Sequence, residues 1–274
     1  MAKLNTLPDA LSSLLHNDRD WIPEHIVESA WLEHTPFAAW LMAALEPRVF
    51  VELGTHRAVS YMAFCQANLR RANPGKCFAI DTWKGDEHAG LYNEDVFAEV
   101  ERLNQKYCAF STLTRGTFDE ALPLFADGSI DLLHIDGFHS YEAVSHDFHS
   151  WLPKMSDKGV VLFHDTEVRD KAFGVWRLWA ELISEYPHFD FHHGHGLGVL
   201  AVGPVIAPKI APLLHPEVAA KDVERFRHHF GELGGEVSRL YRKKFNITPG
   251  KPKKNFRSRL LGHIRSLAQR FRAK

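Results

Sequence analysis

Cysteine is scarce in this chain. There are three cysteines in 274 residues, and their odd number and irregular spacing argue against a disulfide framework and a cysteine metal site. The chain also lacks an uncharged apolar run of about 18 residues, so no membrane-spanning helix is expected. The first 20 residues lack the basic and then apolar segments of a signal peptide. These absences predict a cytoplasmic protein with free, buried thiols.

Acidic residues are missing from the end of the chain. Between Arg239 and Lys274 there are 13 lysines and arginines and no acid, whereas the preceding residues carry 20 bases and all 34 acids. This asymmetry predicts a tail with a partner of its own. Residues 256–274 place apolar side chains on one helical face and arginines around it, which favours an anionic membrane surface. Few aromatic residues could stack on bases, so nucleic acid ranks below the membrane. An acidic partner, a second subunit and a disordered tail stay open.

Two glycine-rich nucleotide-binding patterns are missing as well. Residues 49–61 have the pattern of a buried strand, a tight turn and a helix. Only Gly54 stands where a dinucleotide loop has G-x-G-x-x-G, and the Gly-Lys-Ser/Thr of a P-loop is absent. Glu52 ends the strand beside this one glycine. That pair suits a ligand with an amine and sugar hydroxyls better than a ligand with phosphates.

The following residues alternate between strand and helix patterns. Buried strands are predicted at 77–81, 109–114, 130–136 and 159–165, with helices at 58–69, 94–105, 118–125, 141–151 and 173–185. This alternation is typical of a parallel sheet with helices on both faces. Segments 189–192 and 197–202, joined by a short glycine-rich link, predict a closing antiparallel hairpin.

The chain divides into four expected parts. They are a helical N-terminal extension at 1–47, a ligand-binding domain at 48–204, a helical region at 205–242, and a basic linker with an amphipathic helix at 243–274. In the first part, Thr35-Pro36 predicts a helix start, because proline is favoured at the first helical position.

Several segments resemble one enzyme family. The Glu-Leu-Gly motif at 52–54, with Ser60 in the next helix, resembles the first motif of class I S-adenosylmethionine-dependent methyltransferases. It is most similar to the variant in the catechol and macrolide-sugar O-methyltransferases. The Asp-Thr-Trp-x-Gly-Asp segment at 81–86 resembles bacterial sugar O-methyltransferase-like proteins. Over residues 49–203 the resemblance implies a Rossmann-like, doubly wound α/β fold. Its seven-stranded sheet would have the order 3-2-1-4-5-7-6, with the last strand antiparallel.

The resemblance also implies a site for S-adenosylmethionine at the carboxyl edge of the sheet. Asp81 would meet the ribose hydroxyls, and the turn after the third strand would flank adenine. The residues so assigned to the cofactor are Glu52, Gly54, Thr55, Ser60, Asp81, Thr82, Thr117, Phe118 and Asp136.

Two carboxylates are expected side by side at the same edge. Asp136 ends one predicted strand and Asp165 ends the adjacent strand. Neighbouring carboxylates repel unless a proton or cation lies between them, and such oxygen ligands suit Mg²⁺. His139 starts the helix after Asp136, so both side chains can face one pocket. A local hydrogen bond at the helix start is the alternative role of His139.

The resembling enzymes suggest a role for each of these residues. In catechol and mycinamicin-type O-methyltransferases an Asp at the position of Asp136 binds the metal, and a base stands at the position of His139. Further ligands follow the next strand, where this chain has His-Asp-Thr at 164–166 instead of two acidic or amide ligands. We therefore expect His139 as general base and Asp136, Asp165 and His164 as candidate Mg²⁺ ligands. Because His164 stands where the resembling enzymes have an acidic or amide ligand, a site that works without a metal is an alternative.

Histidine is abundant, with 18 residues. His188, His192, His193 and His195 crowd the closing hairpin, but no spacing demands a Zn²⁺ site. We interpret them as surface or acceptor-pocket residues. His56, in the turn after the first strand, would touch the methionine part of the cofactor or fill the place of the absent glycine.

Together these patterns predict a cytoplasmic S-adenosylmethionine-dependent O-methyltransferase, held peripherally at the inner membrane by its tail. The resemblance to proteins of bacterial surface-polysaccharide synthesis indicates a sugar hydroxyl as acceptor, on a glycan, a glycolipid or a glycosylated natural product. A small-phenol O-methyltransferase and a non-catalytic, cofactor-binding scaffold for glycan enzymes are the alternatives. The oligomeric state stays open, a homo-oligomer included.

Overall fold

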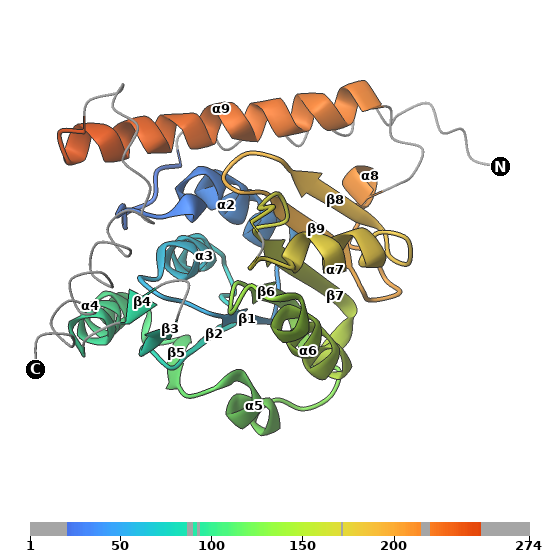
Figure 1. Ribbon diagram of the computed structural model, residues 1–274, viewed down its shortest axis with the longest axis horizontal. Helices are drawn as coiled ribbons and strands as arrows, with labels where there is room; N and C mark the ends of the chain where they lie inside the picture. The colour runs from blue at the N-terminus through green and yellow to red at the C-terminus, as the bar shows by residue number, and fades with distance from the viewer. Residues whose placement is uncertain (1–20, 87–89, 92–93, 171, 215–219, 248–274) are drawn as a thin grey trace, which may run out of the picture. The chain divides into compact units, whose positions relative to one another are not determined.

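The chain folds around one mixed β-sheet. The structure is a computed structural model that describes residues 21–86, 90–91, 94–170, 172–214 and 220–247. The strand order across the sheet is β5-β2-β1-β6-β7-β9-β8 (Figure 1). The strands are β1 Val49–Leu53, β2 Lys76–Asp81, β5 Ser111–Arg115, β6 Ile130–Ile135, β7 Met155–His164, β8 His188–Phe191 and β9 Leu197–Ala201. Counted along the chain this is the order 3-2-1-4-5-7-6, so the predicted sheet is confirmed.

The pairing of the strands also agrees with the prediction. Strands β1, β2, β5, β6 and β7 pair in parallel, and β9, the last strand, is antiparallel to both β7 and β8. The carboxyl ends of the five parallel strands therefore lie at one edge, where ligands bind in sheets of this kind. A small antiparallel pair outside this sheet, β3 Gly85–Asp86 and β4 Gly90–Leu91, was not predicted.

Helices cover both faces of the sheet. The helices of the described residues are α2 Thr35–Leu45, α3 Val59–Leu69, α4 Glu94–Asn104, α5 Phe118–Ala121, α6 Tyr141–Trp151, α7 Val175–Leu182, α8 Ala211–Leu214 and α9 Ala220–Lys244. Short 3₁₀ turns lie at η1 Ala30–His34, η2 Gln105–Tyr107, η3 Leu122–Leu124 and η4 Leu152–Lys154. None of the helices in the described ranges combines the length and apolarity that crossing a bilayer requires.

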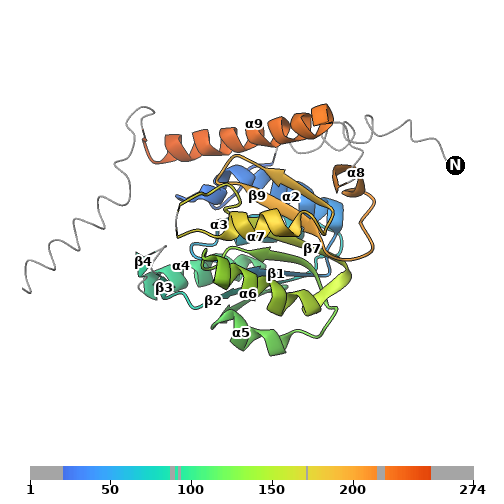
Figure 2. The ribbon, with the colours of Figure 1, turned by 45° about the vertical axis from the view of Figure 1, so that its right-hand side comes forward.

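Alternating residues of each strand face opposite layers. On one face, Val51 and Leu53 join a buried cluster with Phe148 of α6 and Trp179 of α7, and Figure 2 shows these two helices over the same side of the sheet. On the other face, the ring of Phe50 lies 4.5 Å from that of Phe64 in α3. Burial on both faces explains why the strands have nearly continuous apolar sequences.

The N-terminal helix α2 lies between the sheet and α9. Its Trp40 ring lies 5.1 Å from Phe226 and 5.9 Å from Phe230, both in α9. A side chain at Gly234 of α9 would meet the Glu33 carbonyl oxygen at 2.2 Å, so the helix backbone packs directly on η1. The compact unit Met1–Ser238 ends within α9, and a second unit, Arg239–Lys274, begins there.

Some element bounds differ from the predicted ones. Helix is present at 30–45 of the expected N-terminal helical extension, but residues 21–29 are not helical. The helix expected at 173–185 is the shorter α7, and β7 begins at Met155 because Met155 already pairs with Ile130 across an irregularity. The expected basic linker begins inside α9, which continues to Lys244. Residues 1–20 and the predicted helix at 256–274 lie outside the described residues.

Candidate active site

A cavity of about 420 Å³ opens at the carboxyl edge of the sheet. Four turns that follow parallel strands contribute to its wall, together with the segment before α2. The lining residues are Glu28, Ser29, Trp31, Gly54, Thr55, His56, Arg57, Val59, Ser60, Asp81, Thr82, Gly85, Thr117, Phe118, Asp136, Gly137, Phe138 and His139. All residues assigned to the cofactor from the sequence are in this wall except Glu52.

The turn between β1 and α3 has an unusual backbone. Gly54 has a φ of +85°, and a Cβ atom there would lie 2.1 Å from the carbonyl oxygen of Asp136, so the two strand ends approach closely. His56 and Ala58 have φ values of 47° and 60°, a region that costs energy for residues with a side chain. Ala58 thus adopts a conformation that glycine adopts more easily.

Asp81 organises this turn from the end of β2. Its Oδ2 atom accepts hydrogen bonds from the backbone N–H groups of Thr55 at 2.8 Å and His56 at 2.9 Å. Its Oδ1 atom accepts the N–H of Trp83 at 2.7 Å. Because each carboxylate oxygen has two lone pairs, Asp81 can still accept a hydroxyl donor from the cavity.

Glu52 lies behind the cavity wall and is fully buried. Its Oε2 atom accepts a hydrogen bond from Nδ1 of His134 at 2.9 Å, and His134 is the register partner of Glu52 across β6. Burial raises the pKa of Glu52, and the neighbouring His134 and Ser60 side chains oppose that rise. The Oε1 atom is buried without a hydrogen-bond partner among the described residues. A ligand donor in the cavity would satisfy it.

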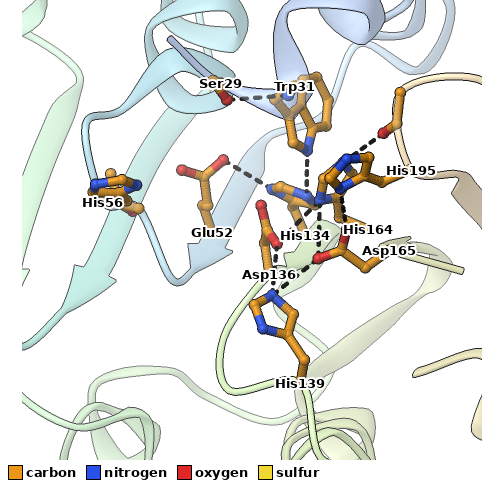
Figure 3. Close-up of polar contacts among 12 residues, drawn as sticks. Ser29, Trp31, Glu52, His56, His134, Asp136, His139, His164, Asp165 and His195 are labelled. Atoms are coloured by element: carbon orange, nitrogen blue, oxygen red, sulfur yellow. Dashed lines mark hydrogen bonds and ion pairs between the residues drawn. The ribbon is translucent and has the colours of Figure 1, made fainter. Parts of the chain in front are cut away.

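His139 contacts both strand-end carboxylates. Its Nε2 atom lies 3.0 Å from Oδ2 of Asp165 and 3.7 Å from Oδ1 of Asp136 (Figure 3). Its ring stacks on Phe173 at 4.5 Å. Burial alone would lower the pKa of His139, but the hydrogen bonds to the two carboxylates raise it to about 9. At pH 7 this histidine is therefore predominantly a cation.

His164 stands between the same two carboxylates. Its Nδ1 atom lies 3.3 Å from Asp136 and 3.5 Å from Asp165. Its Nε2 atom lies 3.0 Å from the carbonyl oxygen of Gly194, which can only accept a hydrogen bond. Although burial opposes it, the charges of Asp165 and Asp136 raise the pKa of His164 well above its ordinary value. His164 is thus an ion-pair partner of the carboxylates in this structure.

A third imidazole reaches Asp165 from the closing hairpin. His195 places Nδ1 3.1 Å from Oδ1 of Asp165. The backbone at Asp165 is left-handed, with a φ of 64°, and its N–H donates to the carbonyl of Gly196. Burial works against ionisation, yet the charge of His164 and the hydrogen bonds of His139 hold the pKa of Asp165 far below its usual range. The buried carboxylate is thus an anion surrounded by imidazoles.

The structure brings together most residues expected at the reaction centre. Donor atoms of Asp136, His139 and Asp165 all lie within 4.8 Å of one another, and His164 lies against them as described above. Sequence reasoning missed the parts played by Trp31 and His195. The histidine-rich hairpin indicated His195 only as one of four similar residues, and no sequence pattern singled out Trp31.

Comparison with family models gives the class of this domain. Residues 51–166 match the model described as "Methyltransferase domain", which runs from β1 to the residue pair after β7. With the strand order 3-2-1-4-5-7-6 this defines the fold as that of class I S-adenosylmethionine-dependent methyltransferases. This segment of the chain is therefore similar to methyltransferase domains.

Similar proteins were found by sequence and by structure. A Sinorhizobium fredii protein described as uncharacterized protein y4gI is 54% identical over 185 residues, which is 68% of this chain and 20% of that protein. The chain thus spans about a fifth of the length of this curated relative. Cofactor-bound Rv0187 from MTB is similar at 15% identity with a TM-score of 0.49, over 71% of this chain and 89% of that one.

A second solved structure is TomG from Streptomyces achromogenes, an O-methyltransferase of tomaymycin synthesis in complex with SAM. It is 15% identical with a TM-score of 0.48, over 71% of this chain and 90% of that one. At these identities and scores the likenesses add nothing to what the strand order establishes.

Proposed function

We propose that the chain binds S-adenosylmethionine in the cavity and transfers its methyl group to an acceptor hydroxyl. The observation that carries the proposal is the pairing of two features in one cavity of about 420 Å³. At one side the β1–α3 turn and Asp81 line the cavity, and Glu52 lies buried behind this wall. These groups supply acceptors for hydroxyls and an amine. At the other side His139 meets the carboxylates of Asp136 and Asp165.

The residues of the cavity fit each part of this cofactor. The carboxylate of Asp81 suits the ribose hydroxyls, and Thr117 with Phe118 forms a wall suited to adenine. For the amino-acid part, the unpartnered Oε1 of Glu52 suits the ammonium group. The Ser60 hydroxyl, near the start of α3, suits the carboxylate, because helix N-termini favour anions.

The cofactor supplies an electrophilic methyl group, so the chain must hold the acceptor oxygen in line and take its proton. His139 lines the cavity, and its imidazole is of the type that can take this proton. Its ring is oriented by Asp165 through Nε2 and by stacking on Phe173. Because its pKa is about 9, His139 must lose its own proton before it can act as a base. Most of the acceleration would come from orienting the reactants.

Magnesium assistance is the alternative form of this mechanism. Asp136 and Asp165 would hold the ion, and two carboxylate oxygens are ligands that Mg²⁺ accepts. The rest of the donor set is imidazole nitrogen, which suits other metals better, and His164 already lies against both carboxylates. The residues therefore fit Mg²⁺ only in part, and no step of the proposed mechanism depends on it.

For the acceptor we propose a sugar hydroxyl of a glycan, a glycolipid or a glycosylated natural product. The resemblance of residues 81–86 to sugar O-methyltransferase-like proteins supports this choice. Phe138, which is 36% exposed at the cavity wall, offers an aromatic face to the apolar side of a sugar ring. A small phenol and a non-catalytic scaffold remain the alternatives. Incubation with labelled cofactor and a panel of glycans and phenols, with and without chelator, separates all three.

Calorimetry on the wild-type protein should detect binding of S-adenosylhomocysteine. Asp81→Ala should weaken it at least about tenfold, because hydroxyls lose a charged acceptor and the turn loses its support at Thr55 and His56. Asp127→Ala is the matched control, since Asp127 pairs with Lys154 outside the cavity. If the wild type binds neither S-adenosylmethionine nor S-adenosylhomocysteine, the proposed function is wrong.

We also propose that the basic tail attaches the protein to an anionic membrane surface, where lipid-linked glycans would be within reach. Its sequence is the main support, because 13 uncompensated bases follow Ser238. The part of the tail that the structure describes, residues 239–247, also supports this proposal. Leu240 and Phe245 are 37% and 48% exposed there, and the ammonium of Lys244 lies over the Phe245 ring.

The full-length protein should co-sediment with anionic vesicles at low salt. High salt should weaken the attachment without abolishing it, because each basic residue contributes about 1 kcal/mol that salt screens, whereas apolar insertion is not screened. A chain truncated after Ile247 keeps all described residues. It should stay in the supernatant when the vesicles sediment, and it should retain its affinity for S-adenosylhomocysteine. Neutral vesicles are the control. Equal sedimentation of both chains would contradict a role of the tail.

A further inference from the structure

A buried chain of hydrogen bonds links the N-terminal segment to Glu52. The indole Nε1 of Trp31 donates to Nε2 of His134 at 3.1 Å, and Nδ1 of His134 lies 2.9 Å from Oε2 of Glu52. The side chains of His134 and Glu52 are fully buried, and Trp31 is 2% exposed. Figure 3 shows the three residues in sequence, with the second oxygen of Glu52 directed away from His134.

The direction of these hydrogen bonds follows from their donors. An indole N–H can only donate, so Nε2 of His134 must accept. The proton of His134 is then on Nδ1 and is donated to Glu52. Trp31 therefore determines which tautomer of His134 is present, in the way that the partner of one ring nitrogen commonly determines the role of the other.

The other carboxylate oxygen of Glu52 also lies behind the cavity wall. Oε1 is buried and has no hydrogen-bond partner within the described part of the chain. Ser60, a residue of the cavity wall, is one of the side chains that act on the pKa of Glu52. A buried polar atom without a partner is costly, and a donor group of a ligand in the cavity would remove that cost.

We propose that Trp31 and His134 are positioning residues that hold Glu52 so that Oε1 receives the ammonium group of the bound cofactor. This inference rests on the proposed function. It extends the site beyond the segment 51–166 that matches a methyltransferase domain, because Trp31 belongs to η1. The indole contributes both a wall of the cavity and the hydrogen bond that orients His134. The segment before α2 is then part of the cofactor site.

The test uses calorimetry on the full-length protein with two probes. S-adenosylhomocysteine carries the ammonium group, whereas 5′-methylthioadenosine has the same nucleoside without the amino-acid part. Trp31→Phe keeps an aromatic ring and removes the indole N–H. We expect this change to weaken the binding of S-adenosylhomocysteine about tenfold and the binding of 5′-methylthioadenosine less than about twofold. Glu52→Gln should show the same selective loss. The double variant should lose little more than Glu52→Gln alone, because both changes act on one contact.

Trp151→Phe is the matched control. Trp151 is fully buried, and its Nε1 has no hydrogen-bond partner among the described residues. It packs in the cluster on the opposite face of the sheet. This change should leave the affinities for both probes unaltered. If Trp31→Phe does not fold, as judged by thermal unfolding, His134→Gln tests the same link.

Three outcomes would overturn the inference. They are equal weakening of both probes by Trp31→Phe, unchanged affinity for S-adenosylhomocysteine, and fully additive losses in the double variant. Equal weakening would mean that Trp31 only shapes the cavity wall. Failure of the proposed function looks different, because the wild type would then bind neither probe.

Discussion

His139→Ala is expected to lower the rate of methyl transfer by about 10²–10⁴-fold, the usual contribution of a general base. Affinity for S-adenosylhomocysteine should stay nearly unchanged, because the groups proposed to bind the ribose, the adenine and the amino-acid part lie on other turns of the cavity. The measurement is transfer from labelled cofactor to the acceptor found in the panel. His146→Ala is the matched control, since His146 forms a similar pair with Asp119 at 2.9 Å on the exposed side of α6.

A chelator separates the two forms of the mechanism. Activity that persists in chelator but is lost in His139→Ala would reject the metal and keep the base. Activity that is lost in chelator and restored by Mg²⁺ would assign the carboxylates of Asp136 and Asp165 to the ion. Full activity of His139→Ala without chelator would reject the proposed role of His139.

The pH dependence of the rate follows from the charge of His139. The pKa of His139 is raised to about 9, so the neutral form that accepts a proton is scarce at pH 7. The rate should rise about tenfold per pH unit from neutrality and level off near pH 9. A flat profile between pH 7 and 9 would mean that another group takes the proton.

The placement of the carboxylates could be predicted because strand ends are visible in sequence. Apolar runs that end at Asp81, Asp136 and Asp165 predict that these three side chains lie at one edge of a parallel sheet. The strand order then brings them toward the turn that follows β1. A strand end predicts which edge a residue occupies. It does not predict the direction in which a ring nitrogen points.

The remaining contacts depend on packing between distant segments. His195 reaches Asp165 because the left-handed backbone at residues 165 and 194–196 folds the hairpin end over β7. Phe173, expected in a helix, instead stacks on His139. Gly174 packs so tightly on Tyr141 that a Cβ atom would lie 2.2 Å from its backbone nitrogen. Such contacts join residues about 30 positions apart, and no local pattern encodes them.

The burial of Glu52 is a related case. The sequence placed it at the end of β1 and therefore at the ligand edge. In the structure it faces the layer of α2 and α3, where His134 covers it. The alternation of side chains along β1 determines which face of the sheet Glu52 occupies. Its hydrogen-bond partner His134 comes from β6, and the indole of Trp31 comes from η1. Only the packed structure brings these three segments together.

Asp165→Asn is expected to cost about 3–5 kcal/mol of unfolding free energy at pH 6.5, the usual loss when one partner of a buried ion pair is removed. Asp165 is 5% exposed and lies 3.0 Å from His139 and 3.1 Å from His195. Asparagine keeps the volume of the side chain, so the loss would come from charge and not from a cavity. Asp119→Asn, which breaks the exposed pair with His146, should change stability by less than about 0.5 kcal/mol.

The size of this loss should depend on pH, because His139 titrates with a raised pKa. A raised pKa adds stability that is complete below the unfolded value of about 6.5 and is lost as pH rises through the folded value. For His139 the folded value is about 9, so this residue alone should cost the wild type about 3 kcal/mol between pH 6.5 and 9.5. His164, whose pKa is also raised by Asp165 and Asp136, changes stability in the same direction. The lowered pKa values of Asp136 and Asp165 add no slope in this window, since both stay ionised. Urea unfolding at the two pH values should therefore show a large difference between wild type and Asp165→Asn at pH 6.5 and a smaller one at pH 9.5. An equal difference at both values would mean that Asp165 does not hold the charges of His139 and His164.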